Sequence, residues 1–93
     1  MAHTQKDKKK LLNRVRRIRG QIDAIERLLE AESEGCTSIL QLIASCRGAI
    51  NGLMAEVIEG HIRFHVISPV HQPKPEQIEA AQELIEVVNT YLK

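Results

Sequence analysis

Two long stretches of the chain place apolar residues at the spacing of an amphipathic helix. In residues 11–29 and again in residues 39–57, apolar side chains recur in alternating steps of four and three positions. This heptad-like period puts one apolar stripe along each helix and suits packing against neighbouring helices. The two predicted stripes consist of Leu11, Val15, Ile18, Ile22, Ile25 and Leu29, and of Ile39, Ile43, Cys46, Ile50, Leu53 and Val57.

Glycine marks the predicted boundary between these two helices. The first helix is predicted to begin near residues 5–7 and to end around Glu34 and Gly35, because glycine readily adopts the left-handed conformation that stops a helix. The second helix is predicted to run from about residues 36–37 to about residues 66–68. Small residues inside the helices are predicted to let other helices approach closely, and these are Gly20, Gly48, Gly52 and Gly60.

Three prolines separate the second helix from a third. Pro69, Pro73 and Pro75 enforce a loop, since proline cannot continue a helix. A third helix is predicted from about Pro75 to Leu92, because proline suits a first helical position and Glu76 suits the positive end of the helix dipole. Its apolar stripe consists of Ile78, Ala81, Ile85, Val88 and Leu92.

These elements predict an all-α protein with one domain, residues 1–93, since 93 residues make one small domain at most. Two long antiparallel helices would cover only one side of each other, and the third helix is short. Apolar surface is therefore expected to stay exposed on a single protomer. Two helical hairpins packed into a four-helix core would cover this surface, which predicts a homo-oligomer.

Charge is divided unevenly along the chain. Residues 1–27 hold nine Lys/Arg and three Asp/Glu, whereas residues 28–93 hold four Lys/Arg and nine Asp/Glu. A basic first helix points to a polyanion or to another subunit's acidic surface, with a merely solvated face as the alternative. No helix-turn-helix, zinc-finger spacing or aromatic platform is present, so contacts to DNA would go mainly to phosphates. The predicted contact residues are Lys10, Arg14, Arg16, Arg17 and Arg19.

The sequence favours a cytoplasmic location. Residues 1–10 are polar and basic, unlike a signal peptide, and no stretch approaches the ~20 apolar residues of a membrane span. Cys36 and Cys46 lie ten positions apart, about 15 Å along one helix, which is too far for a disulfide within it. Cys46 falls on the apolar stripe and is predicted to be a core residue, whereas Cys36 remains a candidate for chemistry.

Cys36, His61 and His65 are candidate metal ligands. The two histidines share one helix face, being four residues apart. Cys36 precedes His61 by 25 positions, about 37 Å along a straight helix. A shared metal would therefore need two antiparallel copies of the chain. The thiolate and imidazole donors suit Ni(II), Co(II) or Zn(II), and His3 with the amine of Ala2, after loss of the initiator Met, are further candidate donors.

No catalytic arrangement is apparent, and the protein is not expected to be an enzyme. The chain has no Gly-rich phosphate loop and no Ser or acid–base pair with an evident partner. A Cys36–His61 nucleophile pair across an interface would still lack an oxyanion site.

Three segments resemble the CsoR/RcnR repressors. They are DKKKLLNRVRRIRGQ at residues 7–21, LQLIA at residues 40–44 and RGAINGLM at residues 47–54. The resemblance implies an all-helical dimer, usually paired into a tetramer, that binds double-stranded operator DNA. It also implies repression of export or detoxification genes, relieved when an effector binds.

In this family four sensing positions distinguish the branches, and here they are His3, Cys36, His61 and His65. Copper and persulfide sensors carry Cys at the last position, where this chain has His65. Formaldehyde sensors carry Pro after Met1 and usually lack the final His, whereas this chain has Ala2. The set therefore resembles the nickel/cobalt branch, although Phe64 stands where that branch can carry Glu.

The predicted function is a Ni(II)/Co(II)-responsive repressor of metal-efflux genes. One alternative is a formaldehyde-responsive repressor in which Cys36 is crosslinked to the Ala2 amine. Another is a metal-storage or structural helical oligomer with no role on DNA.

Overall fold

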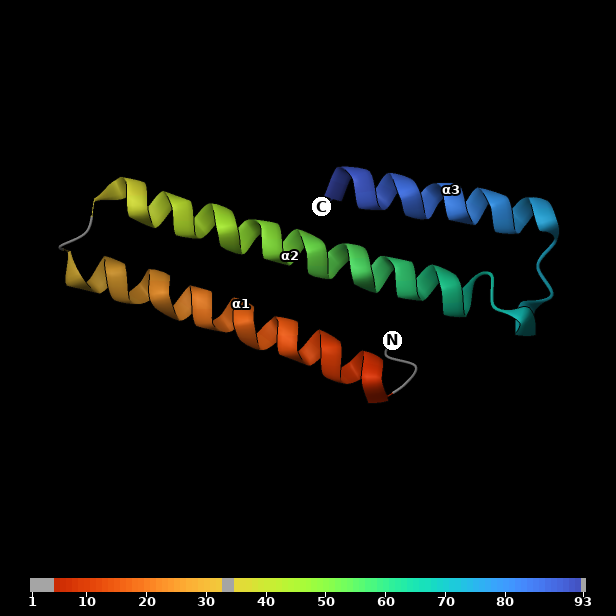
Figure 1. Ribbon diagram of the computed structural model, residues 1–93, viewed down its shortest axis with the longest axis horizontal. Helices are drawn as coiled ribbons and strands as arrows, with labels where there is room; N and C mark the ends of the chain where they lie inside the picture. The colour runs from red at the N-terminus through yellow and green to blue at the C-terminus, as the bar shows by residue number, and fades with distance from the viewer. Residues whose placement is uncertain (1–4, 33–34, 93) are drawn as a thin grey trace.

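The computed structural model describes residues 5–32 and 35–92, and within them it contains three α-helices, one short 3-10 helix and no strand (Figure 1). Helices α1 (Gln5–Ala31) and α2 (Cys36–His65) run antiparallel, and α3 (Pro75–Leu92) returns along the other side of α2. The predicted all-α fold with two long helices and a shorter third one is confirmed. The short 3-10 helix, η1, spans Pro69–His71 between α2 and α3.

The predicted end of the first helix is wrong. Helix α1 ends at Ala31, and the next residue, Glu32, adopts the left-handed conformation with φ of 55°. Gly35 has φ of −74° and ψ of 161°, an extended conformation, and serves as the N-cap of α2. Gly35 thus starts the second helix and does not end the first, and Glu34 lies outside the described residues.

The start of α3 agrees with the prediction because its first turn is well capped. The backbone N–H of Lys74 donates to Oε1 of Gln77 at 2.8 Å, while the carbonyl of Lys74 accepts from the N–H groups of Gln77 and Ile78. Pro75 occupies the first helical position, where its missing N–H costs nothing.

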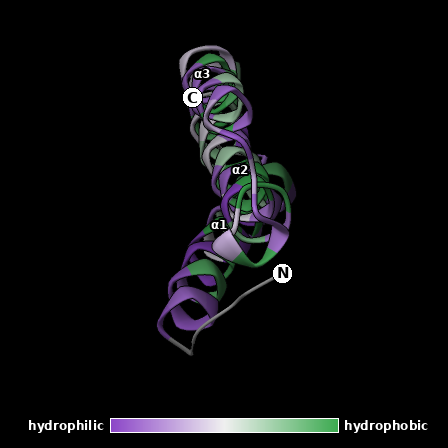
Figure 2. Ribbon diagram, turned by 90° about the vertical axis from the view of Figure 1, so that its right-hand side faces the viewer, coloured by the Kyte–Doolittle hydropathy of each residue, from purple (hydrophilic) through white to green (hydrophobic). Residues whose placement is uncertain are grey.

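The protomer is one helix thick. Its extents are 58 × 27 × 12 Å, and the shortest of these matches the diameter of a single helix, about 10–12 Å. Figure 2 shows α3, α2 and α1 in one row. The radius of gyration is 17.6 Å, against about 13 Å for a compact domain of 100 residues. Each helix therefore keeps faces that its own chain leaves uncovered.

Helix α2 supplies half of the buried apolar residues of the small core. A cluster of Ile62 with Ala81 and Ile85 joins α2 to α3, and Ile58 and Ile67 pack against it. On the α1 side the buried residues include Ile18, and Cys46 on α2 is only 5% exposed, which confirms its prediction as a core residue.

The predicted surplus of apolar surface is confirmed. Ile22 and Leu29 on α1, and Ile43 and Ile50 on α2, belong to the predicted stripes yet are 43–57% exposed. Only part of each stripe is covered within one chain. None of the helices among the described residues is long and apolar enough to cross a membrane.

Ile85→Ala is expected to destabilise the fold by about 2–3 kcal/mol, because it opens a cavity in the α2–α3 cluster around a side chain that is 4% exposed. Urea unfolding followed by circular dichroism at fixed protein concentration measures this. Glu86→Ala, on the exposed side of the same turn, is the matched control and should change stability by less than about 0.5 kcal/mol. Equal losses in the two variants would contradict the assigned core.

Candidate functional site

The two histidines near the end of α2 form a pair that fits one metal ion. His61 and His65 are both exposed, with ring centroids 5.3 Å apart and planes tilted by 32°. A metal–nitrogen bond of about 2.0–2.1 Å puts each ring centre roughly 3 Å from the ion, so two rings on one ion lie up to about 6 Å apart. The observed centroid spacing is therefore within the range of two imidazole ligands on one ion.

The remaining predicted donors are not brought to this pair within one chain. Cys36 is an exposed free thiol at the first residue of α2, 25 positions from His61, or about 37 Å at the helical rise. Among the described residues, no three His, Cys, Asp or Glu side chains lie close enough together to hold a metal ion. Ala2 and His3 lie outside the described residues. Phe64, 45% exposed beside the histidines, offers no donor atom.

Cys36 and the histidines nevertheless occupy one continuous exposed face of α2. The face consists of Cys36, Ile43, Ile50, Met54, His61 and His65, which are separated by steps of seven, seven, four, seven and four residues. At 3.6 residues per turn, these six positions stay within an arc of about 60° around the helix. All six residues are exposed, although Arg47 also projects from this arc. We call these six residues the sensing face of α2.

Sequence patterning did not single out the sensing face. The predicted stripe combined Ile43 and Ile50 with Cys46, which is buried on another side of α2. The signal that was present is the heptad spacing from Cys36 to Ile43 and Ile50, which continues through Met54 to His61. Candidate donors therefore stand at both ends of an apolar surface that the chain itself leaves uncovered.

The structure separates the predicted DNA-contacting residues into two groups. Lys10, Arg16, Arg17 and Arg19 are exposed along α1. Arg14 instead turns toward α2, where its Nη2 lies 2.7 Å from Oε1 of Glu56, and the two side chains are 26% and 19% exposed. Of the five predicted contacts, only the first group is thus fully presented to solvent.

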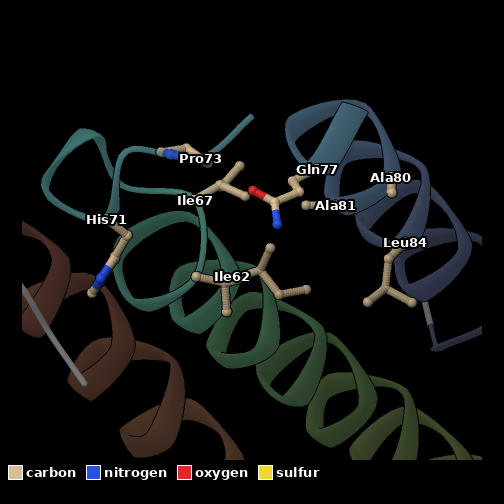
Figure 3. Close-up of a pocket in the computed structure, with 9 residues that line it drawn as sticks. Ile62, Ile67, His71, Pro73, Gln77, Ala80, Ala81 and Leu84 are labelled. Atoms are coloured by element: carbon tan, nitrogen blue, oxygen red, sulfur yellow. The ribbon is translucent and has the colours of Figure 1, made fainter. Parts of the chain in front are cut away.

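A mainly apolar hollow lies between the end of α2 and the start of α3 (Figure 3). Its volume is about 500 Å³, and Ile62, Ile67, Ala81 and Leu84 supply much of its wall. His71 is exposed and also borders this hollow. Among the described residues that line it, His71 is the only ionisable side chain.

Comparison with known proteins assigns the chain to a family. Residues 7–90 match the family described as metal-sensitive transcriptional repressor. The chain belongs to this repressor family. This confirms the resemblance to the CsoR/RcnR repressors, and it places the protein among transcriptional regulators.

Relatives of this repressor match along their full length. An uncharacterized protein in the bioA 5′ region of Serratia marcescens is 48% identical over 93 residues, covering all of both chains. The transcriptional repressor RcnR of Citrobacter koseri is 40% identical over 93 residues, again covering both chains completely. A glutamate-to-histidine variant of the formaldehyde-responsive regulator FrmR of Salmonella enterica serovar Typhimurium is similar in structure. Its TM-score is 0.69 and its identity 44%, and the match covers 98% of this chain and 99% of that one.

The glycines of the repressor do not all serve the predicted helix packing. A Cβ at Gly52 would lie 2.6 Å from Nη1 of Arg14, so the group that approaches Gly52 is a side chain and not another helix. Around Gly20, Gly48 and Gly60, a Cβ would meet nothing within 4 Å in the described part of the protomer.

Proposed function

We propose that this repressor is a cytoplasmic protein that binds operator DNA and leaves it on binding Ni(II) or Co(II), so that metal-efflux genes are expressed. The observation that carries the proposal is the His61–His65 pair with its ring spacing of 5.3 Å. Together with the Cys36 thiolate, these imidazoles form a borderline donor set that suits Ni(II) and Co(II) and also permits Zn(II). Cu(I) would favour more sulfur than this chain supplies.

The proposed metal site lies between two protomers whose α2 helices run antiparallel across a two-fold axis. The midpoint between Cys36 and His61 falls between residues 48 and 49, and so does the midpoint between Ile43 and Met54. The same register therefore brings Cys36 to the partner's histidines and sets Ile43 against the partner's Met54. One arrangement brings the three donors of α2 together and buries the apolar part of the sensing face.

The surface area supports such an obligate dimer. The chain exposes 7001 Å², whereas a compact protein of its mass would expose about 5400 Å². The difference, about 1600 Å² per protomer, is in the range buried by obligate dimers. Pairing of two dimers into a tetramer would cover further exposed apolar residues on α3, namely Leu84, Val87 and Tyr91.

In this proposal the N-terminal arm completes the coordination. Phe64 supplies no carboxylate, so His3 and the Ala2 amine are assigned as the remaining donors. Metal binding can release DNA only if the low-affinity conformation binds metal better, and the coupling must be reciprocal. Closure of the arm would displace α1 and, with it, the basic surface formed by Lys10, Arg16, Arg17 and Arg19. Arg14 is the fifth proposed DNA contact.

A titration of the DNA-bound protein with Ni(II) or Co(II) tests the proposal. Fluorescence anisotropy on labelled duplex from upstream of the protein's own gene should show at least a tenfold loss of DNA affinity, within the ~5–150-fold range of typical allosteric couplings. Mg(II) is the control, because it prefers oxygen ligands and should have no effect. Unchanged DNA affinity with Ni(II) and Co(II) would contradict the proposed effector.

Formaldehyde is the second candidate effector, and the similarity to FrmR favours it. The Cys36 thiolate would add to the carbonyl carbon, and the Ala2 amine would then displace the hydroxyl group as water. The resulting methylene bridge adds the mass of one carbon atom to the chain. Mass spectrometry that detects this gain, together with loss of DNA binding, would favour formaldehyde over metal.

A further inference from the structure

An ion pair between Arg14 and Glu56 connects α1 to α2. Arg14 is the predicted DNA contact that the structure withdraws from solvent, through its 2.7 Å contact with Glu56. Both side chains are less than a third exposed, so this pair is screened less by salt than an ion pair on the open surface. In this conformation the charge of Arg14 is directed at a carboxylate of the protein.

Gly52 provides the space that this arrangement requires. It lies one helical turn before Glu56 on α2, and a Cβ there would be 2.6 Å from Nη1 of Arg14. The Nε of Arg14 is also buried, and no described residue forms a hydrogen bond with it. The guanidinium group therefore rests on the backbone of α2, and an alanine at position 52 would displace it.

We propose that Glu56 competes with DNA phosphate for Arg14. The Arg14–Glu56 pair, which lies against Gly52, thereby lowers the affinity of the protein for operator DNA. Arg14 lies four residues after Lys10 and three before Arg17, so once released it would extend the exposed basic surface of α1. A phosphate contact through Nη2 of Arg14 requires that its bond to Glu56 break. Glu56 thereby lowers DNA affinity without touching DNA.

The position of the pair connects it to the sensing face. Glu56 lies two residues after Met54 and five before His61, on the helix that carries the candidate ligands. A shift of α2 against α1 would change the Arg14–Glu56 distance directly. The inference rests on the proposed function only in that DNA is the ligand, and it holds for either candidate effector.

Glu56→Gln should bind DNA about 3–10-fold more tightly than the wild type. Arg14 would then gain one phosphate contact, so the dependence of affinity on salt should steepen by about one released counterion. Fluorescence anisotropy on the duplex from upstream of the protein's own gene, at several salt concentrations, measures both quantities. In an Arg14→Ala background the gain should vanish, whereas in an Arg17→Ala background it should persist.

Two further variants separate this effect from a change in net charge. Gly52→Ala leaves the charge unaltered and should also tighten DNA binding, because its methyl group displaces Arg14; alanine is a good helix former at that position. Glu59→Gln removes a carboxylate of the same helix that pairs with Arg63, and any effect it has should not depend on Arg14.

Two outcomes distinguish failure of the inference from failure of the proposed function. The inference about Arg14 and Glu56 would be overturned alone by weaker DNA binding of Glu56→Gln and Gly52→Ala. A gain in DNA affinity that persists in the Arg14→Ala background would overturn it as well. A wild-type protein that fails to bind the duplex at low salt would overturn the proposed function and this inference together.

Discussion

Cys36→Ala is expected to remove the thiolate-to-cobalt charge-transfer band of the Co(II)-loaded protein and to weaken Co(II) binding by about 100-fold or more. Loss of an outer-shell partner alone costs about 10–100-fold in metal affinity, so loss of a direct ligand should exceed that range. Cys36 is exposed at the start of α2, so the substitution creates no cavity in the core and should leave the helical fold unchanged. Absorption spectroscopy during a Co(II) titration measures the band and the affinity together.

Cys46 supplies the matched control for this experiment. It is the second cysteine of the chain, but it is buried and lies off the sensing face. Cys46→Ala should therefore keep the charge-transfer band while losing some stability through the smaller core side chain. A wild-type protein with no such band, or a Cys36→Ala variant with an unchanged one, would remove Cys36 from the site.

The helices were predictable because their signals are local. Heptad spacing defined α1 and α2, and Pro75 with Glu76 defined the start of α3. The end of α1 was not predictable from the same signals. Glu32 adopts the left-handed conformation that glycine would favour, and Gly35 became the N-cap of the next helix.

The candidate site was predictable only in part. The helical rise alone showed that Cys36 and His61 cannot meet within one straight helix. Which cations of α1 face solvent could not be deduced, because that depends on the rotation of α1 against α2. This rotation directs Arg14 to Glu56 and leaves Arg17 exposed.

The central claim is that one protomer supplies Cys36 and its partner supplies His61 and His65. Mixing two defective proteins tests this claim. A Cys36→Ala chain keeps both histidines, and a His61→Ala, His65→Ala chain keeps the thiol, so neither alone should show the thiolate-to-cobalt band. A mixed dimer would contain one complete site and one that lacks all three side chains.

The decisive measurement is the Co(II) absorption spectrum after the two variants are unfolded together in equal amounts and refolded. Random pairing across a two-fold interface makes half of the dimers mixed, each with one of its two sites intact, so about a quarter of the wild-type charge-transfer band should return. Size-exclusion chromatography confirms that subunits re-pair. No recovery of the band in refolded dimers would contradict a site shared between protomers.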